Sequence, residues 1–227
     1  MFIEKRKFKN SKGLTLSAIY EGENRYGPVA VICHGYKSSK DSPLTQKAFS
    51  RKLIERGISV YRFDFTGHGE SEGSISKITP LDAYDDLVCA VKNIGEGRFA
   101  LYGSSFGGFT AILYATQYSV LALALKAPVS DYAVTARIVS PAREQFIQNT
   151  KDIDLYEKAK NIKCPTLIMH GDKDDVVPIT QSQKLIAALK CEKKLEVIVG
   201  ADHDIAGEDL EKANTQIADF FKKTLVR

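Results

Sequence analysis

The stretch Phe99-Ala-Leu-Tyr-Gly-Ser-Ser-Phe-Gly-Gly108 decides how this chain folds. Its first four residues are apolar and predict a short buried strand, and Phe109-Thr-Ala-Ile-Leu-Tyr-Ala115 predicts a buried helix. Between them, Gly103-x-Ser105-x-Gly107 fits a sharp strand-to-helix turn with a nucleophilic serine at its apex. The flanking residues are glycines because that turn leaves no room for side chains. We therefore predict that the Ser105 hydroxyl stands free of the sheet, beside the N–H groups of a helix.

Short apolar runs alternate with helical patterns along the whole chain. Predicted strands cover 29–33, 58–63, 99–102, 120–125, 166–169 and 195–199, after an antiparallel pair over 2–9 and 14–20. Several runs are apolar on both faces, as is typical of parallel strands covered by helices on both sides. The sequence therefore predicts a doubly wound, mostly parallel α/β sheet of about eight strands in a single domain over residues 1–227.

Helix signals mark the segments between these strands. Ser42 and Pro43 predict the start of a helix that ends at Gly57, and Thr79-Pro80 predicts the start of another. Further helices are expected around Leu185–Leu189 and Leu210–Phe221. The pattern breaks at about 128–163, where a polar stretch replaces the expected helix. We interpret this insertion as a small cap over the site.

Composition limits the class of protein. The chain has 227 residues, 44% hydrophobic and 26% charged, with a net charge of +4, as in an ordinary soluble globular domain. The basic residues near the N-terminus indicate a charged edge strand more than a nucleic-acid site. There is no run long enough to span a membrane and no signal peptide pattern, so a cytoplasmic protein is expected. The four cysteines and four histidines show no metal-ligand spacing, and the cysteines are expected to be reduced thiols.

A catalytic serine needs a base within hydrogen-bonding reach and an acid that orients that base. The predicted strand 166–169 runs into the acid-rich loop His170-Gly-Asp-Lys-Asp-Asp-Val-Val-Pro178, and strand 195–199 runs into a loop that carries His203. Both loops follow the carboxyl ends of strands, at the same sheet edge as Ser105. The order serine, aspartate, histidine is the one expected of α/β hydrolases.

The chain resembles the α/β-hydrolase-fold serine hydrolases, in particular the monoglyceride lipase, serine aminopeptidase and cinnamoyl/feruloyl esterase branches. The resemblance covers almost the whole chain. It rests on the serine turn, on His203 after the last strand, and on three further motifs: His34-Gly-Tyr36, Asp64-Phe-Thr-Gly-His-Gly-Glu-Ser-Glu-Gly73 and His170-Gly-x-x-Asp174-x-x-Val177-Pro178. An α/β-hydrolase fold with a short cap insertion is what this resemblance implies.

Carried onto this sequence, the resemblance implies Ser105 as the nucleophile, His203 as the general base and acid, and Asp174 as the orienting carboxylate. It implies an oxyanion hole formed by the backbone N–H groups of Tyr36 and Phe106. The supporting residues are His34, Gly35, Gly103 and Gly107. No metal and no cofactor are implied.

Other residues remain alternatives or neighbours of this site. The D-x-x-V-P spacing favours Asp174 as the acid, and its rivals are Asp131, Asp172, Asp175, Asp202 and Asp204. Ser104, one place before the nucleophile, is expected to face away. Tyr36, Phe106 and Tyr132 are candidates for the wall of a substrate pocket.

The expected function is hydrolysis of small to medium carboxylic esters through an acyl-enzyme, with a small-molecule ester as the partner. Acyl thioesterase, monoacylglycerol lipase and peptidase activities stay open. A thioesterase for acyl-CoA would use basic residues at the mouth, for which Lys37, Lys40 and Arg137 are loose candidates. A non-catalytic binding protein of the same fold is the alternative from another class. The sequence predicts neither the physiological substrate nor the oligomeric state.

Overall fold

The computed structural model describes residues 1–95, 99–135 and 142–226. The strands are β1 (Phe2–Lys9), β2 (Thr15–Gly22), β3 (Val29–Cys33), β4 (Ser59–Phe63), β5 (Phe99–Ser104), β6 (Leu123–Lys126), β7 (Thr166–Gly171) and β8 (Lys193–Ile198). The helices are α1 (Ala48–Ile54), α2 (Pro80–Ile94), α3 (Phe106–Ala115), α4 (Ala142–Thr150), α5 (Leu155–Ala159), α6 (Thr180–Ala188) and α7 (Gly207–Leu225). A π-helical turn, Pro43–Lys47, precedes α1.

The strands form one eight-stranded sheet in the order β1-β2-β4-β3-β5-β6-β7-β8. β1 pairs with β2, and β2 with β4, in antiparallel fashion, whereas every later pair is parallel. The expected mostly parallel sheet of about eight strands is therefore confirmed.

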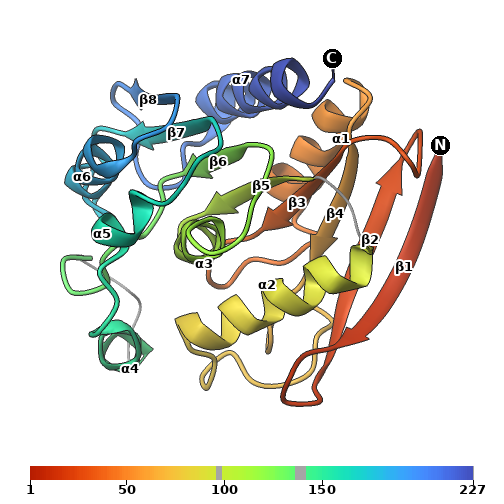
Figure 1. Ribbon diagram of the computed structural model, residues 1–227, viewed down its shortest axis with the longest axis horizontal. Coiled ribbons are helices and arrows are strands. Elements are labelled where there is room, and N and C mark those ends of the chain that lie inside the picture. The colour runs from red at the N-terminus through yellow and green to blue at the C-terminus, as the bar shows by residue number, and fades with distance from the viewer. Residues whose placement is uncertain (96–98, 136–141, 227) are drawn as a thin grey trace.

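Helices cover both faces of this sheet (Figure 1). On one face, α1 and α7 bury apolar residues such as Phe49, Leu53 and Phe221 against the strands. On the other face, α2, α3, α5 and α6 pack over the larger apolar cluster. The alternation of strands and amphipathic helices in the sequence produces this sandwich of three layers, because each helix buries one apolar stripe on the sheet.

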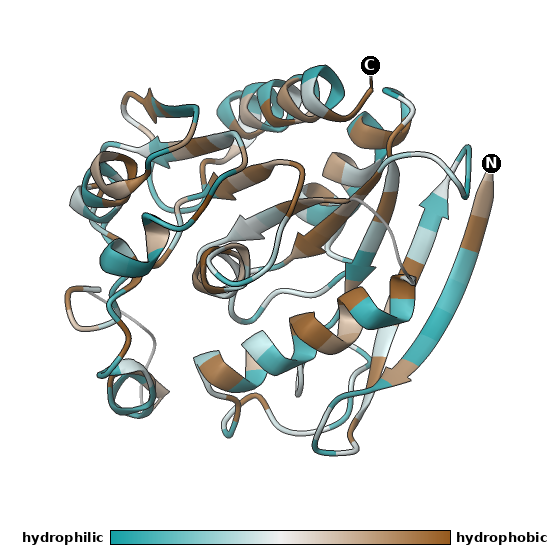
Figure 2. Cartoon of the chain, viewed as in Figure 1, coloured by the Kyte–Doolittle hydropathy of each residue, from teal (hydrophilic) through white to brown (hydrophobic). Residues whose placement is uncertain are grey.

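The basic N-terminal segment forms the edge strand β1, whose residues alternate between exposed and partly buried. Figure 2 shows the middle of this strand as hydrophilic. Arg6 bonds to the Glu4 carboxylate at 2.8 Å and stacks over the Tyr20 ring. These charges thus have partners on the strand itself, as in other protected sheet edges.

Several predicted elements differ from the structure at their ends, and two of them illustrate the reasons. The strand expected over 120–125 runs from Leu123 to Lys126, because Ser119 to Ala122 form the turn that brings the chain to the sheet. The helix expected from Pro43 begins as the π-helical turn, in which the Ser42 hydroxyl accepts a hydrogen bond from Thr45 Oγ1 instead of capping a backbone N–H. By contrast, Thr79 and Asp82 form the complete capping box that starts α2.

The strand order places the loops that follow β3 and β5 at one edge of the sheet. The chain moves from β3 outward to β4 on one side and then to β5 on the other, so β3 and β5 are neighbours whose following loops diverge. Ligand sites of open α/β sheets lie at such a point, beyond the carboxyl ends of the strands. The loop after β3 and the serine turn after β5 both start there.

A buried ion-pair cluster fixes the loop that follows β3. The Lys40 side chain is 1% exposed, and its Nζ lies 3.0 Å from the fully buried Asp64 carboxylate and 2.7 Å from Glu70. The Asp64 carboxylate also accepts the Lys40 N–H at 2.6 Å and the Glu70 N–H at 2.9 Å. Lys40 is therefore occupied within the fold and cannot serve as a basic residue for an acyl-CoA substrate.

Replacing Lys40 by methionine is expected to lower the free energy of unfolding by about 3–5 kcal/mol, because it leaves the Asp64 carboxylate buried without a cation. Urea denaturation measures this loss. The matched control is Lys47→Met, which removes a half-exposed lysine that lies 3.4 Å from Asp41. That change is expected to cost about 0–1 kcal/mol. Equal costs for the two variants would contradict the assigned importance of the buried cluster.

Candidate active site

Ser105 occupies the sharp turn between β5 and α3. Its φ of 51° lies in a region that a residue with a side chain rarely adopts. The turn is possible because glycines flank it: a Cβ on Gly103 would lie 2.5 Å from the Gly107 carbonyl oxygen, and one on Gly107 would lie 2.3 Å from the Cys33 carbonyl oxygen. Both contacts are too close for a real side chain. The sequence motif thus produces the geometry that it predicts.

The three polar side chains expected at this edge lie in a hydrogen-bonded row. His203 Nε2 is 2.9 Å from Ser105 Oγ, and His203 Nδ1 is 2.7 Å from Asp174 Oδ2. Ser105 comes from the end of β5, Asp174 from the loop after β7 and His203 from the loop after β8. The arrangement can pass the serine proton to the imidazole while the carboxylate holds the ring in the required tautomer.

The Asp174 carboxylate is buried between two histidines. Burial alone would raise its pKa, but His170 and His203 outweigh that effect and hold the Asp174 pKa well below its usual range. Val176 and Val177 also donate their N–H groups to Asp174 Oδ1, at 2.9 and 2.8 Å. The carboxylate is therefore charged at neutral pH and fixed in position.

His170 braces the same carboxylate from behind. Its Nε2 lies 2.9 Å from the Val177 carbonyl oxygen and 3.0 Å from Asp174 Oδ2, so this nitrogen carries a proton. Its Nδ1 lies 2.7 Å from the Ser182 hydroxyl, which donates to it.

The rival carboxylates serve other hydrogen bonds. Asp172 accepts the Gly200 N–H at 2.6 Å, and Asp131 accepts the Ala133 N–H at 2.9 Å. Asp202 accepts the N–H groups of Asp204 and Ile205 within its own turn. The structure thus brings Asp174, and none of these three, to the far nitrogen of His203.

Two backbone N–H groups beside Ser105 are available as donors. In the described part of the chain, neither the Tyr36 nor the Phe106 N–H is bonded to a backbone carbonyl. The Ser105 N–H is different, because it donates to the Lys126 carbonyl oxygen at 3.0 Å and so ties the turn to β6. Gly35 lies against the serine, and a Cβ there would be 3.6 Å from Ser105 Cβ.

His34 and His68 fasten the loop that carries Tyr36. His34 Nε2 accepts the Phe65 N–H at 3.2 Å, and His68 Nε2 accepts the Lys37 N–H at 3.3 Å. Burial and the nearby His68 lower the pKa of His34 to about 3, so its ring is neutral. Burial also lowers the pKa of His68. Both rings therefore hold these loops through fixed hydrogen bonds.

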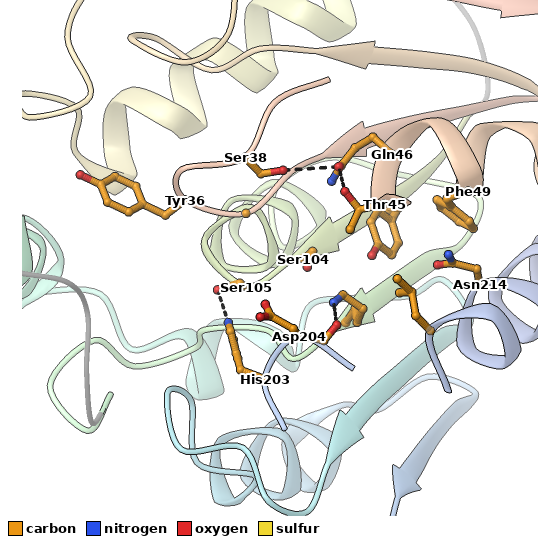
Figure 3. A pocket seen from close by; sticks show the side chains of 14 residues that line it. Tyr36, Ser38, Thr45, Gln46, Phe49, Ser104, Ser105, His203, Asp204 and Asn214 are labelled. Carbon is orange, nitrogen blue, oxygen red and sulfur yellow. Dashed lines mark hydrogen bonds between the residues drawn. The ribbon is translucent and has the colours of Figure 1, made fainter. Parts of the chain in front are cut away.

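Two pockets of different character meet at Ser105. The apolar pocket, of about 190 Å³, is lined by Tyr36, Lys37, Ser105, Phe106, Val129, Tyr132, Phe146, Val176, Val177 and His203. The polar pocket, of about 140 Å³, lies on the side of α1 and α7. Figure 3 shows Ser104, Gln46 and Asn214 around the polar pocket, with the bonded pair Ser105 and His203 at its edge.

The pockets correct one expectation and extend the list of site residues. Ser104 does not face away but lines the polar pocket, because the strand end that carries it is open on that face. Lys126 and Asn214 also line this pocket and were missed by the sequence analysis. A lysine that ends an apolar strand at the catalytic edge is the signal that would have identified Lys126. Arg137, a loose candidate for a basic mouth, lies outside the described residues.

The described residues contain neither a cluster of metal ligands nor a helix that could span a membrane. Over residues 1–95, 99–135 and 142–226, there is no group of His, Cys, Asp and Glu side chains with the arrangement of a metal site. None of the helices in these ranges combines the length and the apolar character that crossing a bilayer would require.

The sheet, the helices on both faces and the serine turn define an α/β hydrolase. The chain belongs to the family described as serine aminopeptidase, S33, whose sequence profile matches residues 27–153 and 143–210. Among curated relatives, YfhR of Escherichia coli K12 is 27% identical over 181 residues, which are 76% of this chain and 63% of that protein. An uncharacterized protein of Mycobacterium tuberculosis is 26% identical over 184 residues, 78% of this chain and 63% of its own length. The chain thus spans less than two thirds of these relatives.

Solved structures share the fold at low sequence identity. Est1E from Butyrivibrio proteoclasticus, solved with ferulic acid bound, has a TM-score of 0.87 at 21% identity and covers 98% of this chain and 100% of its own. The esterase domain of a Rhodothermus marinus protein has a TM-score of 0.79 at 22% identity, with 99% and 100% covered. Mouse alpha/beta hydrolase domain-containing protein 10 has a TM-score of 0.77 at 20% identity, with 97% and 99% covered.

Proposed function

We propose that this protein is a serine carboxylesterase that cleaves small to medium carboxylic esters. One observation carries the proposal: Ser105 Oγ, His203 and Asp174 form a continuous hydrogen-bonded row through 2.9 and 2.7 Å contacts at the mouth of two pockets. A serine is made nucleophilic by this combination of a base and an orienting carboxylate.

In the proposed reaction, Ser105 Oγ bonds to the ester carbonyl carbon while its proton moves to His203 Nε2. The N–H groups of Tyr36 and Phe106 stabilise the carbonyl oxygen as it becomes negative. His203 then gives its proton to the leaving alcohol, and the acyl–oxygen bond breaks. Water attacks the acyl-enzyme with His203 again as base, which releases the acid and restores the Ser105 hydroxyl.

The apolar pocket supports an apolar or aromatic group on one side of the ester bond. Phe106, Tyr132 and Phe146 lie in its wall, and their rings pack at 5.1–5.5 Å from their aromatic neighbours. Tyr132 and Phe146 belong to the inserted segment 128–163, of which residues 136–141 lie outside the described part of the chain, and we propose that its described parts act as a small cap over the site. Est1E, which shares the fold, was solved with an aromatic acid bound.

A fluorophosphonate probe tests the serine assignment directly. We expect one mole of label per mole of protein, located on Ser105 by peptide mass spectrometry, because the probe phosphonylates an activated serine, with loss of fluoride. The same preparation is then tested with 4-nitrophenyl esters, acyl thioesters and aminoacyl 4-nitroanilides. Faster turnover of the esters supports the carboxylesterase. Labelling with a preference for the anilides would instead favour a peptidase, and folded protein without labelling would favour a binding protein.

A further inference from the structure

Lys126 is a buried cation without an anion beside it. It is 6% exposed, and its Nζ donates to the backbone carbonyl oxygen of Asp204 at 2.8 Å. Within the described ranges, no carboxylate lies within 4.0 Å of this ammonium, whereas the other buried cations, Lys40 and Arg62, are each paired with carboxylates. An ammonium removed from water without a counter-ion is costly, so this position calls for an explanation.

The Lys126 side chain belongs to the wall of the polar pocket. Lys126 and Ser104 are register partners on β6 and β5, so their side chains lie on the same face of the sheet. Tyr102, two residues before Ser104, shares that face, and all three line the pocket. The buried positive charge therefore lies at the wall of the space that begins at Ser105.

A buried polar group of α7 also faces this pocket. Asn214 is 2% exposed, and its Nδ2 has no hydrogen-bond partner among the residues that the structure describes. Figure 3 shows the amide end of Asn214 directed into the pocket. A buried amide without a partner is costly, and its terminal torsion lets it turn a donor toward a ligand. Lys126 and Asn214 thus supply two donors from two different elements.

From this arrangement we infer that the polar pocket binds a carboxylate carried by the substrate, with Lys126 and Asn214 as its donors. This inference rests on the proposed esterase function. The carboxylates of Asp204, Asp174 and Asp202 all act on Lys126 electrostatically, but none of them lies within 4.0 Å of its Nζ. Asp174 is already bonded to His170 and His203, and water screens the exposed Asp202 and Asp204. One buried cation matches one carboxylate charge, whereas a phosphate dianion would leave a second charge unpaired.

The pocket also limits where that carboxylate stands in the substrate. Its volume is about 140 Å³, and Ser105 and His203 form part of its wall. The carboxylate must then lie a few bonds from the reacting carbonyl. The substrate class is therefore a half-ester of a short dicarboxylic acid or an ester of a short hydroxy acid, with its apolar half in the other pocket.

The test compares substrates that differ only in charge. On the acyl side, the mono-4-nitrophenyl ester of adipic acid is compared with that of adipic acid monoamide, and on the alcohol side acetylglycolate is compared with acetylglycolamide. We expect a preference of about tenfold or more in kcat/KM for the anion in one of the two pairs, in the range of charge-assisted hydrogen bonds. In Lys126→Met that preference is expected to fall to onefold or below.

The ratio of kcat/KM for the anionic substrate to kcat/KM for its neutral partner distinguishes carboxylate binding by Lys126 from a purely structural role. Because Lys126 also holds the Asp204 carbonyl, a merely structural role would lower kcat/KM for both members of a pair equally and leave the ratio unchanged. The matched control is Lys223→Met, an exposed lysine of α7, in which the ratio is expected to stay as in the wild type. Asn214→Leu serves as a second variant and is expected to lower the ratio without lowering the melting temperature.

A measurement without turnover keeps this inference separate from the esterase proposal. Glutarate is expected to raise the melting temperature of the wild type and of Ser105→Ala, but not of Lys126→Met. Hydrolysis of the neutral esters with no charge preference and no stabilisation by glutarate would overturn the carboxylate site and leave the esterase standing. No hydrolysis of any ester, together with stabilisation by glutarate that needs Lys126, would overturn the esterase and leave the anion site.

Discussion

Replacing Ser105 by alanine is expected to lower kcat/KM for short 4-nitrophenyl esters by about 10⁴- to 10⁶-fold. The change removes the oxygen that lies 2.9 Å from His203 Nε2 and that would form the acyl-enzyme. It removes little else, because the turn is held by backbone bonds: the Ser105 N–H donates to Lys126, and the Ser105 carbonyl accepts from Val129. Initial rates at several substrate concentrations measure the loss.

The controls for this variant are its stability and a second serine. The melting temperature of Ser105→Ala is expected to stay close to that of the wild type. Ser119→Ala, at the exposed far end of the segment that follows the turn, is expected to retain wild-type rates. A Ser105→Ala protein that keeps more than a tenth of the wild-type rate would remove the nucleophile from the proposed mechanism.

Replacing Asp174 by asparagine is expected to lower kcat by about 10⁴-fold while KM changes little. The carboxylate now accepts the His203 Nδ1 proton at 2.7 Å, which leaves Nε2 free to accept the proton of Ser105. An amide group in the same place can instead donate to Nδ1, which would put the ring proton on Nε2 and prevent it from acting as a base. Steady-state kinetics with the 4-nitrophenyl esters separate the two constants.

The neighbouring Asp175 provides the matched control for this second variant. Its residue is exposed, so Asp175→Asn removes the same charge one position away from the row of catalytic side chains. We expect its kcat to lie within about threefold of the wild type. Equal losses for the two variants would mean that loop charge, and not the orientation of His203, controls the rate. A nearly active Asp174→Asn protein would remove Asp174 from its proposed role.

The sequence alone predicts the strands, the helices and the serine turn, because each of these depends mainly on residues that are close together in the chain. The glycines around Ser105 are required because the turn leaves no room for a Cβ, and Thr79-Pro80 marks the cap of the helix that follows it directly. The apolar runs on β3, β5 and β6 indicate strands that are buried on both faces of the sheet. The convergence of Ser105 and His203 also follows, because the carboxyl ends of parallel strands share one edge.

The rest depends on contacts between distant segments. In the sequence, Lys126 is only the polar residue at the end of an apolar strand. Asn214 is only one of several polar residues in an amphipathic helix. Only the packing of α7 against one face of the sheet brings the two to one pocket. The choice among the aspartates was likewise settled only by spacing until the structure placed Asp174, and not Asp172, next to His203.

The two pockets share only Tyr36, Ser105 and His203 among the residues that line them. The loop after β3 contributes to both pockets, and the other walls come from separate parts of the chain: α1, α7 and the ends of β5 and β6 on one side, and α3, α4 and the segments after β6 and β7 on the other. Mutations in those separate parts therefore reshape one pocket and leave the other intact. Duplicated copies of such a gene can diverge by changing one half of the accepted molecule at a time, while the chemistry of bond cleavage is inherited unaltered.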